Sequence, residues 1–334
     1  MASTVRALEA CLAEAALLER ALLAVRQGIV LVGPNDEVVI TNPASAGLIR
    51  PAATLGQLTP HGLQALVRQA RAAEGTVNQE VEVGWPMRTV AATASPLGSG
   101  HVLLTLEDVT QSRRTDAMRR DFVAAASHEL RTPVSAIVAT TDALVLALGR
   151  DEDAVARFAK QLGDSAEQLA SLVRDLLDLS RLEGSDLPHE RVELAGMARE
   201  EVARHSRTVH VDLEEIEVQG SRADLALALR NLLDNALRHT PPEGTVSVRV
   251  RSSGSEAWIE VSDTGEGISS RDLPRIFERF YRVDSARSRG TGGTGLGLAI
   301  VRHVAESHHG SAEAESELGA GSTFRIRLPL SPRS

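Results

Sequence analysis

Two rows of apolar residues seven positions apart constrain the fold of this chain more than any other feature. The first row is Val123, Leu130, Ile137 and Leu144, and the second is Val155, Leu162, Leu169 and Leu176. Because Gly149-Arg150-Asp151 lies between them, the pattern predicts two long antiparallel helices joined by a short turn. One hairpin cannot bury both rows, so we expect two copies to pair as a four-helix bundle.

The chain has 334 residues, of which 43% are hydrophobic and 24% are charged. That length exceeds one ordinary hydrophobic core, so we expect two or three domains of a soluble globular protein. The net charge of −9 and the lack of a local basic cluster argue against a nucleic-acid partner.

Cys11 is the sole cysteine, which excludes an intramolecular disulfide or a cysteine metal cluster and suits a reducing cytoplasm. Charged residues, including Arg6, Glu9 and Glu14, interrupt the N-terminal apolar runs and argue against a signal peptide. No run approaches the ~18 consecutive apolar residues of a membrane span. We therefore expect a cytoplasmic protein without membrane insertion.

The region before the heptad rows has a different hydrophobic period. Residues 3–26 carry apolar residues at helical spacing and predict an N-terminal amphipathic helix. Segments 29–32 and 38–40 flank turn residues and predict a hairpin. Together with a helix expected over 63–73, strands expected over 77–83, 88–94 and 101–107 predict a small α+β domain that ends near Val109.

Beyond the second heptad row, a helix expected over residues 222–239 carries a polar stripe. Asn231, Asn235 and Arg238 follow one another at i, i+4 and i+7, beside a buried face of leucines. Two amide oxygens on adjacent turns suit Mg²⁺, and Arg238 could reach a phosphate. Taken alone, the stripe is explained equally well by a solvated helix face.

After this helix, strands are expected over 245–251, 257–262 and 322–328. Two segments that contain glycine lie between the second and third of these strands. In Asp263-Thr264-Gly265-Glu266-Gly267, the carboxylate can accept a hydrogen bond from an exocyclic amine, although a simple β-turn is the alternative. The segment from Gly290 to Gly297 precedes a helix expected from Leu298 to Ser307, and free amides at a helix start favour phosphate. Alone it is weak evidence, because its spacing matches neither a Walker motif nor a Rossmann context.

One histidine on the first heptad helix has the features of a reactive group. His128 falls on the outward side of the helix, and the neighbouring Glu129 can accept a proton or orient the ring. Pro133 cannot donate to the Glu129 carbonyl, so we expect the helix to bend just past His128. The alternative is a bystander, since the chain contains ten histidines.

The motifs in this order resemble a known family. The segments that begin at Asn231, Asp263 and Gly290 resemble the N, G1 and G2 boxes of the ATPase superfamily that includes gyrase, heat-shock chaperones, MutL and histidine kinases. Phe277-Glu278-Arg279-Phe280-Tyr281 resembles the F box of histidine kinases. Ser127-His128-Glu129-Leu130-Arg131-Thr132-Pro133 resembles the H box of sensor histidine kinases of the HisKA type, and the resemblance covers residues 110–330.

This resemblance implies roles for individual residues. It implies that His128 is the phosphoacceptor, Glu129 its acid/base partner, and Thr132 the residue that aligns water for phosphatase action. It implies that Asn231 and Asn235 hold Mg²⁺ and that Asp263 binds adenine. The other residues that we assign to nucleotide binding are Arg238, Gly265, Gly267, Gly293, Thr294, Gly295, Leu296 and Gly297. Arg238 and His239 stand where many relatives have lysine and tyrosine.

The first domain resembles a PAS sensor fold, through residues 28–32, Asn42-Pro43-Ala44 and the exit over residues 106–110. We therefore predict a multidomain α+β protein. An N-terminal amphipathic helix (1–20) precedes a PAS-like α/β sensor (21–110). An antiparallel helical hairpin (111–184) that forms a dimeric four-helix bundle follows, and then an α/β sandwich ATP-binding domain (185–332).

The resemblance implies a homodimeric sensor histidine kinase. It would move the γ-phosphoryl group of Mg-ATP to His128 and then to an aspartate of a cognate response regulator, and would also act as a phosphatase of that regulator. One rival is an ATPase or serine kinase without phosphohistidine, against which the H and F boxes argue. The other is a degenerate kinase acting as a scaffold, against which the intact Asn231, Asn235 and Asp263 argue.

Overall fold

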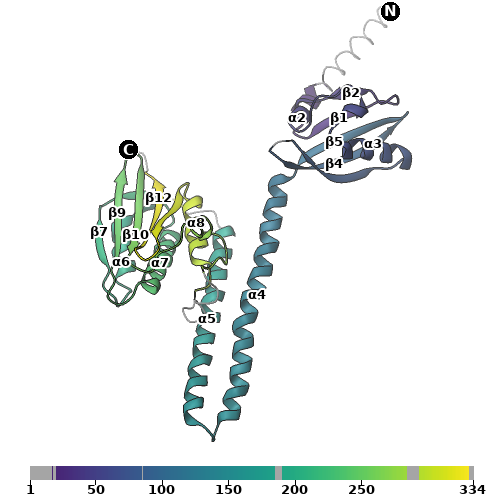
Figure 1. Cartoon of the computed structure of the whole chain (residues 1–334). Helices are drawn as coiled ribbons and strands as arrows, with labels where there is room; N and C mark the ends of the chain where they lie inside the picture. Colours follow the sequence, from purple (N-terminus) through teal and green to yellow (C-terminus); the bar gives the residue numbers. More distant parts are fainter. Residues whose placement is uncertain (1–16, 18–19, 85, 185–189, 284–292, 331–334) are drawn as a thin grey trace, which may run out of the picture. The chain divides into compact units, whose positions relative to one another are not determined.

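The computed structural model describes residues 17, 20–84, 86–184, 190–283 and 293–330. It divides the chain into two compact units, Met1–Asp121 and Phe122–Ser334 (Figure 1). Most of the helix predicted over residues 3–26 lies outside the described residues. Gly290, Thr291 and Gly292 of the predicted glycine segment also lie outside them.

The first unit contains one antiparallel sheet with the strand order β2-β1-β5-β4-β3. Its elements are β1 (Gly28–Val32), β2 (Val38–Thr41), α2 (Pro43–Ala46), η1 (Leu55–Gln57), α3 (His61–Ala73), β3 (Val77–Val83), β4 (Arg88–Gly98) and β5 (His101–Asp108). The helix α3 packs against β3, β4 and β5, and buries Leu63, Leu66 and Val67 there. The strands and the helix predicted between residues 29 and 107 are confirmed, with small shifts at their ends.

The predicted pair of long helices is confirmed as α4 (Thr110–Ala147) and α5 (Glu152–Gly184). The first of them, α4, continues through Pro133 as one helix, so the bend expected there stays a prediction. The heptad residues Leu130, Ile137 and Leu144 are half-buried, but Val123, Val138 and Leu146 are exposed. A single chain therefore leaves much of the apolar surface of α4 uncovered.

The helix α4 also contains a stretch that is long and apolar enough to cross a membrane, by length and composition alone. Its mean hydropathy is 1.3, and 11% of it is buried. This stretch contains no long uninterrupted apolar run, because polar residues such as Thr140, Thr141 and Asp142 are interspersed in the apolar part of the helix. The absence of membrane insertion therefore stays a prediction.

The C-terminal part of the second unit is a sheet with the order β11-β12-β10-β9-β7, accompanied by the two-stranded pair β6-β8. Its elements are β6 (Glu190–Glu193), α6 (Leu194–Val202), β7 (His210–Leu213), β8 (Glu217–Gly220), α7 (Arg222–His239), β9 (Val246–Ser253), β10 (Glu256–Asp263), η2 (Leu273–Arg275), α8 (Gly297–Ser307), β11 (Ser311–Glu317) and β12 (Gly321–Pro329). The helices α6, α7 and α8 contact the sheet strands and form the second layer (Figure 1).

Several of these elements carry no clear sequence signal. The strand β11 has the sequence SAEAESE and contains no fully buried residue, so hydrophobic alternation cannot reveal it. It forms because its backbone pairs with β12 from Ser311 to Glu317. The strands β6, β7 and β8 have four residues each, too few to show a period. None of these four strands, nor the helix α6, is predicted from the sequence.

The C-terminal half of α5 shares a hydrophobic core with the sheet domain. Leu172, Leu179 and Leu182 of α5 are buried in the same cluster as Leu225 of α7 and Ile300 of α8. An ion pair also joins α5 to the sheet domain, because Arg181 Nη2 donates to Oδ1 of the buried Asp224 at 2.7 Å. This half of α5 therefore forms part of the wall of the C-terminal domain.

Truncating Leu179 should test this shared core. Leu179 is 1% exposed, and Leu179→Ala should destabilise the second unit by about 2–5 kcal/mol because it leaves a cavity. Glu167→Ala is the control, because Glu167 is an exposed charged residue of the same helix and its truncation should change stability by less than about 0.5 kcal/mol. Urea unfolding, followed by Trp258 fluorescence in a Trp85→Phe background, measures both changes. Equal effects would contradict the shared core.

Candidate functional site

A cavity of about 400 Å³ lies in the second unit, between α7, the start of α8, the loop after β10 and one face of α5. Its volume is within the usual range for small-molecule sites. The residues that line it are Ser171, Asp175, Asn231, Asp234, Asn235, Arg238, His239, Asp263, Glu266, Gly267, Ile268, Ile276, Tyr281, Arg282, Val283, Gly293, Thr294, Gly295, Gly297, Leu298, Leu318 and Ser322.

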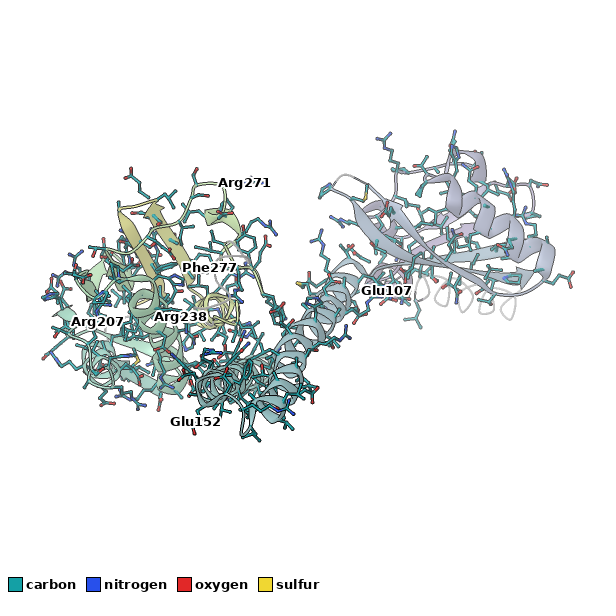
Figure 2. The ribbon with its side chains drawn as sticks, turned by 60° about the horizontal axis from the view of Figure 1, so that its bottom comes forward. Glu107, Glu152, Arg207, Arg238, Arg271 and Phe277 are labelled. Carbon is teal, nitrogen blue, oxygen red and sulfur yellow. The ribbon has the colours of Figure 1, made fainter. Side chains whose placement is uncertain are left out.

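The helix α7 places its whole predicted polar stripe on the cavity wall (Arg238 is labelled in Figure 2). The Asn231 side chain donates through Nδ2 to the Leu227 carbonyl at 2.9 Å within the helix. Its Oδ1 atom therefore faces the other way, 2.7 Å from the position that a Cβ on Gly297 would take. Asn231 thus presents an oxygen toward the start of α8, where the cavity wall continues.

Asp263 ends β10 and is 8% exposed. Burial raises the pKa of its carboxyl group, and backbone hydrogen bonds from Gly265 and Ser322 act in the opposite direction. The bond from the Gly265 amide to Asp263 Oδ1 is 2.8 Å long. The backbone thus fixes one oxygen of this carboxyl group, which suits a directional contact with a ligand donor.

Two glycines of the predicted loops are required by the backbone. Gly267 has φ +69°, and a Cβ there would lie 2.0 Å from the Glu317 carbonyl oxygen. Gly295 has φ +72°, and a Cβ there would lie 2.9 Å from the backbone of Phe280. Both positions combine a left-handed conformation with a close approach of another segment. Glycine at each position lets two chain segments meet at the cavity edge.

The cavity also contains a pair of side chains that the sequence did not assign. His239 Nδ1 and Glu266 Oε1 lie 2.7 Å apart, and both residues line the cavity. Because Glu266 belongs to the loop after β10, this contact ties the end of α7 to that loop. His239 departs from the family pattern, and that departure is the signal that pointed to this position.

A second unpredicted contribution comes from α5. Asp175 lines the cavity and accepts a hydrogen bond from Thr294 Oγ1 at 2.5 Å. Burial is the main cause that raises the pKa of Asp175, and the bond from Thr294 lowers it. The heptad pattern could not identify this residue, because it shows that α5 is amphipathic but not which domain covers its polar positions.

The structure does not bring every predicted residue to the cavity. Leu296 is fully buried in the hydrophobic core, and neither it nor Gly265 is among the described residues that line the cavity. His128, Glu129 and Thr132 also lie outside the described cavity wall. The predicted nucleophile and the predicted nucleotide pocket therefore occupy separate places on the second unit.

The His128 side chain is 73% exposed, which confirms the outward position expected from the heptad pattern. Its Nδ1 atom lies 3.4 Å from Glu129 Oε1. The Thr132 hydroxyl donates to the His128 carbonyl at 3.5 Å, one turn along the helix. Because Nδ1 faces a carboxylate, Nε2 is the ring nitrogen available to an incoming group.

The donor set fits a magnesium ion. Asn231 and Asn235 are one helical turn apart, both line the cavity, and Asn231 presents an amide oxygen there. Mg²⁺ prefers oxygen ligands and keeps several waters, so a two-amide site suits it when substrate phosphates complete the coordination.

Comparisons with known proteins agree with these features. Residues 220–332 match the family described as Histidine kinase-, DNA gyrase B-, and HSP90-like ATPase. Residues 118–185 match the His Kinase A (phospho-acceptor) domain. The sheet domain thus has the fold of an ATP-binding domain, and the helical hairpin matches a phosphoacceptor domain.

Two relatives cover much of the chain. It is 39% identical over 285 residues to the sensor-like histidine kinase SenX3 of Mycobacterium tuberculosis strain H37Rv, which corresponds to 78% of this chain and 69% of the relative. It is 42% identical over 239 residues to SenX3 of Mycolicibacterium smegmatis, which corresponds to 68% of this chain and 62% of the relative. The chain thus spans somewhat under two thirds of the second relative.

A solved structure of histidine kinase ThkA, in complex with response regulator protein TrrA, has a TM-score of 0.52. The match covers 91% of this chain and 96% of that chain at 18% identity, so it shows a similar fold.

Two substitutions should distinguish the end of the cavity assigned to adenine from the end assigned to the metal ion. Asp263→Ala should weaken nucleotide binding about tenfold or more with or without Mg²⁺, because a hydrogen bond to a buried charged group is lost. Asn235→Ala should weaken only the metal-dependent part of the affinity. Calorimetric titration with ATP, with Mg²⁺ and with EDTA, measures both effects. Equal and small losses in both variants would show that the two ends are wrongly assigned.

Proposed function

This chain belongs to the sensor histidine kinases, and from that premise we propose that it transfers the γ-phosphoryl group of ATP to His128 and then to an aspartate of a response regulator. The observation that carries the proposal is one cavity lined by Asn231, Asn235, Asp263 and the glycine loop, in the same unit as an exposed histidine. ATP is the substrate expected of the matched ATPase family.

The proposed chemistry assigns one role to each group. Asp263 accepts a hydrogen bond from the adenine amine, and the amides at the start of α8 contact phosphate. Asn231 and Asn235 would hold Mg²⁺, which neutralises phosphate charge when it is bound. His128 Nε2 attacks the γ-phosphorus, the bond to the bridging oxygen of ADP breaks, and Glu129 accepts the proton from Nδ1.

The separation of His128 from the cavity has a consequence for this reaction. Attack requires the reacting atoms to come within about 3–3.5 Å. We propose that the ATP-binding domain moves relative to α4, or that the nucleotide reaches His128 of a second copy. Movement requires the packing of α5 against the sheet domain to be released first.

We propose that the chain works as a homodimer in the cytoplasm, with a response regulator as its partner. The exposed apolar residues of α4 and α5 support pairing, because two hairpins would cover them in a four-helix bundle. The same pairing explains the apolar stretch of α4 without a membrane. A regulator partner is supported by the ThkA structure, which contains one.

We also propose that the first unit is a PAS-like sensor. Its antiparallel sheet, ordered β2-β1-β5-β4-β3 with its helices inserted between β2 and β3, supports this assignment. The exit through Asp108 and Thr110 into α4 supports a signalling role. Asp108 Oδ1 accepts from the Thr110 amide, and the Thr110 hydroxyl accepts from the Thr89 amide, so the sheet and the helix are joined by hydrogen bonds.

Labelling with γ-phosphate-labelled Mg-ATP tests the phosphoacceptor. We expect an acid-labile, alkali-stable phosphate on the purified protein, which identifies a phosphohistidine rather than a phosphoserine. His128→Gln should abolish the label and leave ATP affinity nearly unchanged, because His128 does not line the cavity. Persistent labelling of the variant would place the acceptor elsewhere.

Substitutions of Thr132 should separate kinase from phosphatase activity. The kinase step needs the His128 ring and Glu129, whereas hydrolysis of a regulator's aspartyl phosphate needs a hydroxyl to hold the attacking water in line. Thr132→Ala should therefore keep most autophosphorylation and lose most phosphatase activity, and Thr132→Ser should retain both. Wild-type phosphatase rates in both variants would assign Thr132 no catalytic role, only the restricted backbone of a residue before proline.

A further inference from the structure

Asp175 brings a carboxylate from α5 into the nucleotide cavity. It and Ser171, one helical turn earlier, are the described α5 residues on the cavity wall. The segment from Leu172 to Leu182 packs into the core of the sheet domain and fixes this face of α5 against the cavity. Asp175 therefore reaches the cavity because of that packing, and it would leave when α5 leaves.

The neighbours of Asp175 are groups that suit a phosphate. Its Oδ2 atom accepts the hydroxyl hydrogen of Thr294, in the glycine loop before α8. Arg238 is close enough to lower the pKa of Asp175 by charge attraction, and Arg174 acts in the same direction. Asp178, the neighbouring carboxylate on α5, acts against them. One carboxylate thus already accepts a hydrogen bond from a hydroxyl and lies within the electrostatic influence of an arginine of the cavity wall.

Stability does not explain a carboxylate in this place. Burial is the largest influence on the Asp175 pKa and raises it, so the folded protein disfavours the charged form. With a raised pKa, the stabilising contribution is present at low pH and is lost as pH rises through the folded value. Folding therefore works against the charged form of Asp175, a pattern that is typical of functional sites.

We propose that Asp175 is an internal competitor of the nucleotide phosphates. While α5 is packed against the sheet domain, the Asp175 carboxylate accepts the hydrogen bond of the Thr294 hydroxyl and repels the polyphosphate by charge. Nucleotide binding must then displace Asp175, and by thermodynamic linkage ATP weakens the packing of α5 to the same extent. This coupling would release the ATP-binding domain from α5 when ATP is bound. The inference rests on the proposed ATP site.

The experiment compares Asp175→Asn and Asp175→Ala in the full chain. Asn removes the charge and keeps a hydrogen-bond acceptor, whereas Ala removes both. Calorimetry measures the affinities of adenosine, ADP and a non-hydrolysable ATP analogue, each with Mg²⁺. Both variants should bind the ATP analogue about fivefold more tightly or better, because one close like-charge repulsion is removed. The gain should be smaller for ADP and absent for adenosine.

The matched control is Asp164→Asn. Asp164 is exposed and lies on the same face of α5, about three helical turns before Asp175, so it offers the same charge change away from the cavity. It should leave all three affinities unchanged. Circular dichroism and the thermal midpoint verify that the Asp175 variants are folded.

Autophosphorylation kinetics provide a second measurement, because substitution of a residue with a purely structural role would not lower KM while kcat is kept. The Asp175→Asn variant should lower KM for ATP and leave kcat equal or higher. Unchanged or weaker binding of the ATP analogue, an equal gain for adenosine, or a gain in the Ala variant alone would overturn the proposal. If the wild-type chain binds no nucleotide, the proposed function itself fails, and the two failures are thereby distinguished.

Discussion

The whole site depends on the division of α7 into two faces. Leu225, Leu229 and Leu232 are fully buried beneath the sheet, which fixes the rotation of the helix about its axis. With that rotation fixed, Asn231 and Asn235 both lie on the cavity wall, and Asn231 presents its oxygen toward Gly297 at the start of α8. A helix with a weaker apolar face could rotate, and two amide oxygens would then lose the alignment that a small hard cation requires.

The sheet supplies the second fixed point. The strand β10 pairs along its length with β9 on one side and β12 on the other, up to Asp263 itself. Because both neighbours hold its backbone, the carboxylate at its end is set by the ladder and not by a mobile loop. The α7 amides and Asp263 therefore belong to different layers that share one core. Their separation is as rigid as the packing between those layers.

Patterns within one element were readable from the sequence, and relations between elements were not. The heptad rows gave α4 and α5, and the leucine spacing gave α7 with its polar stripe. The strand β11 was missed because its pairing with β12, and not its own side chains, makes it a strand. Asp175 was missed for a related reason, since a carboxylate on an amphipathic helix looks solvated until its packing partner is known.

The position of α5 links these observations. Its C-terminal half carries Leu179 into the core of the sheet domain and Asp175 into the cavity, and Arg181 adds an ion pair with Asp224. The exposed apolar residues of the hairpin would be covered by a second hairpin in the proposed dimer. One helix thus joins the nucleotide site, the shared core and the proposed dimer. Under the proposed competition, a change in the packing of α5 would alter nucleotide access and the mobility of the sheet domain together, without any change in the residues proposed to contact ATP.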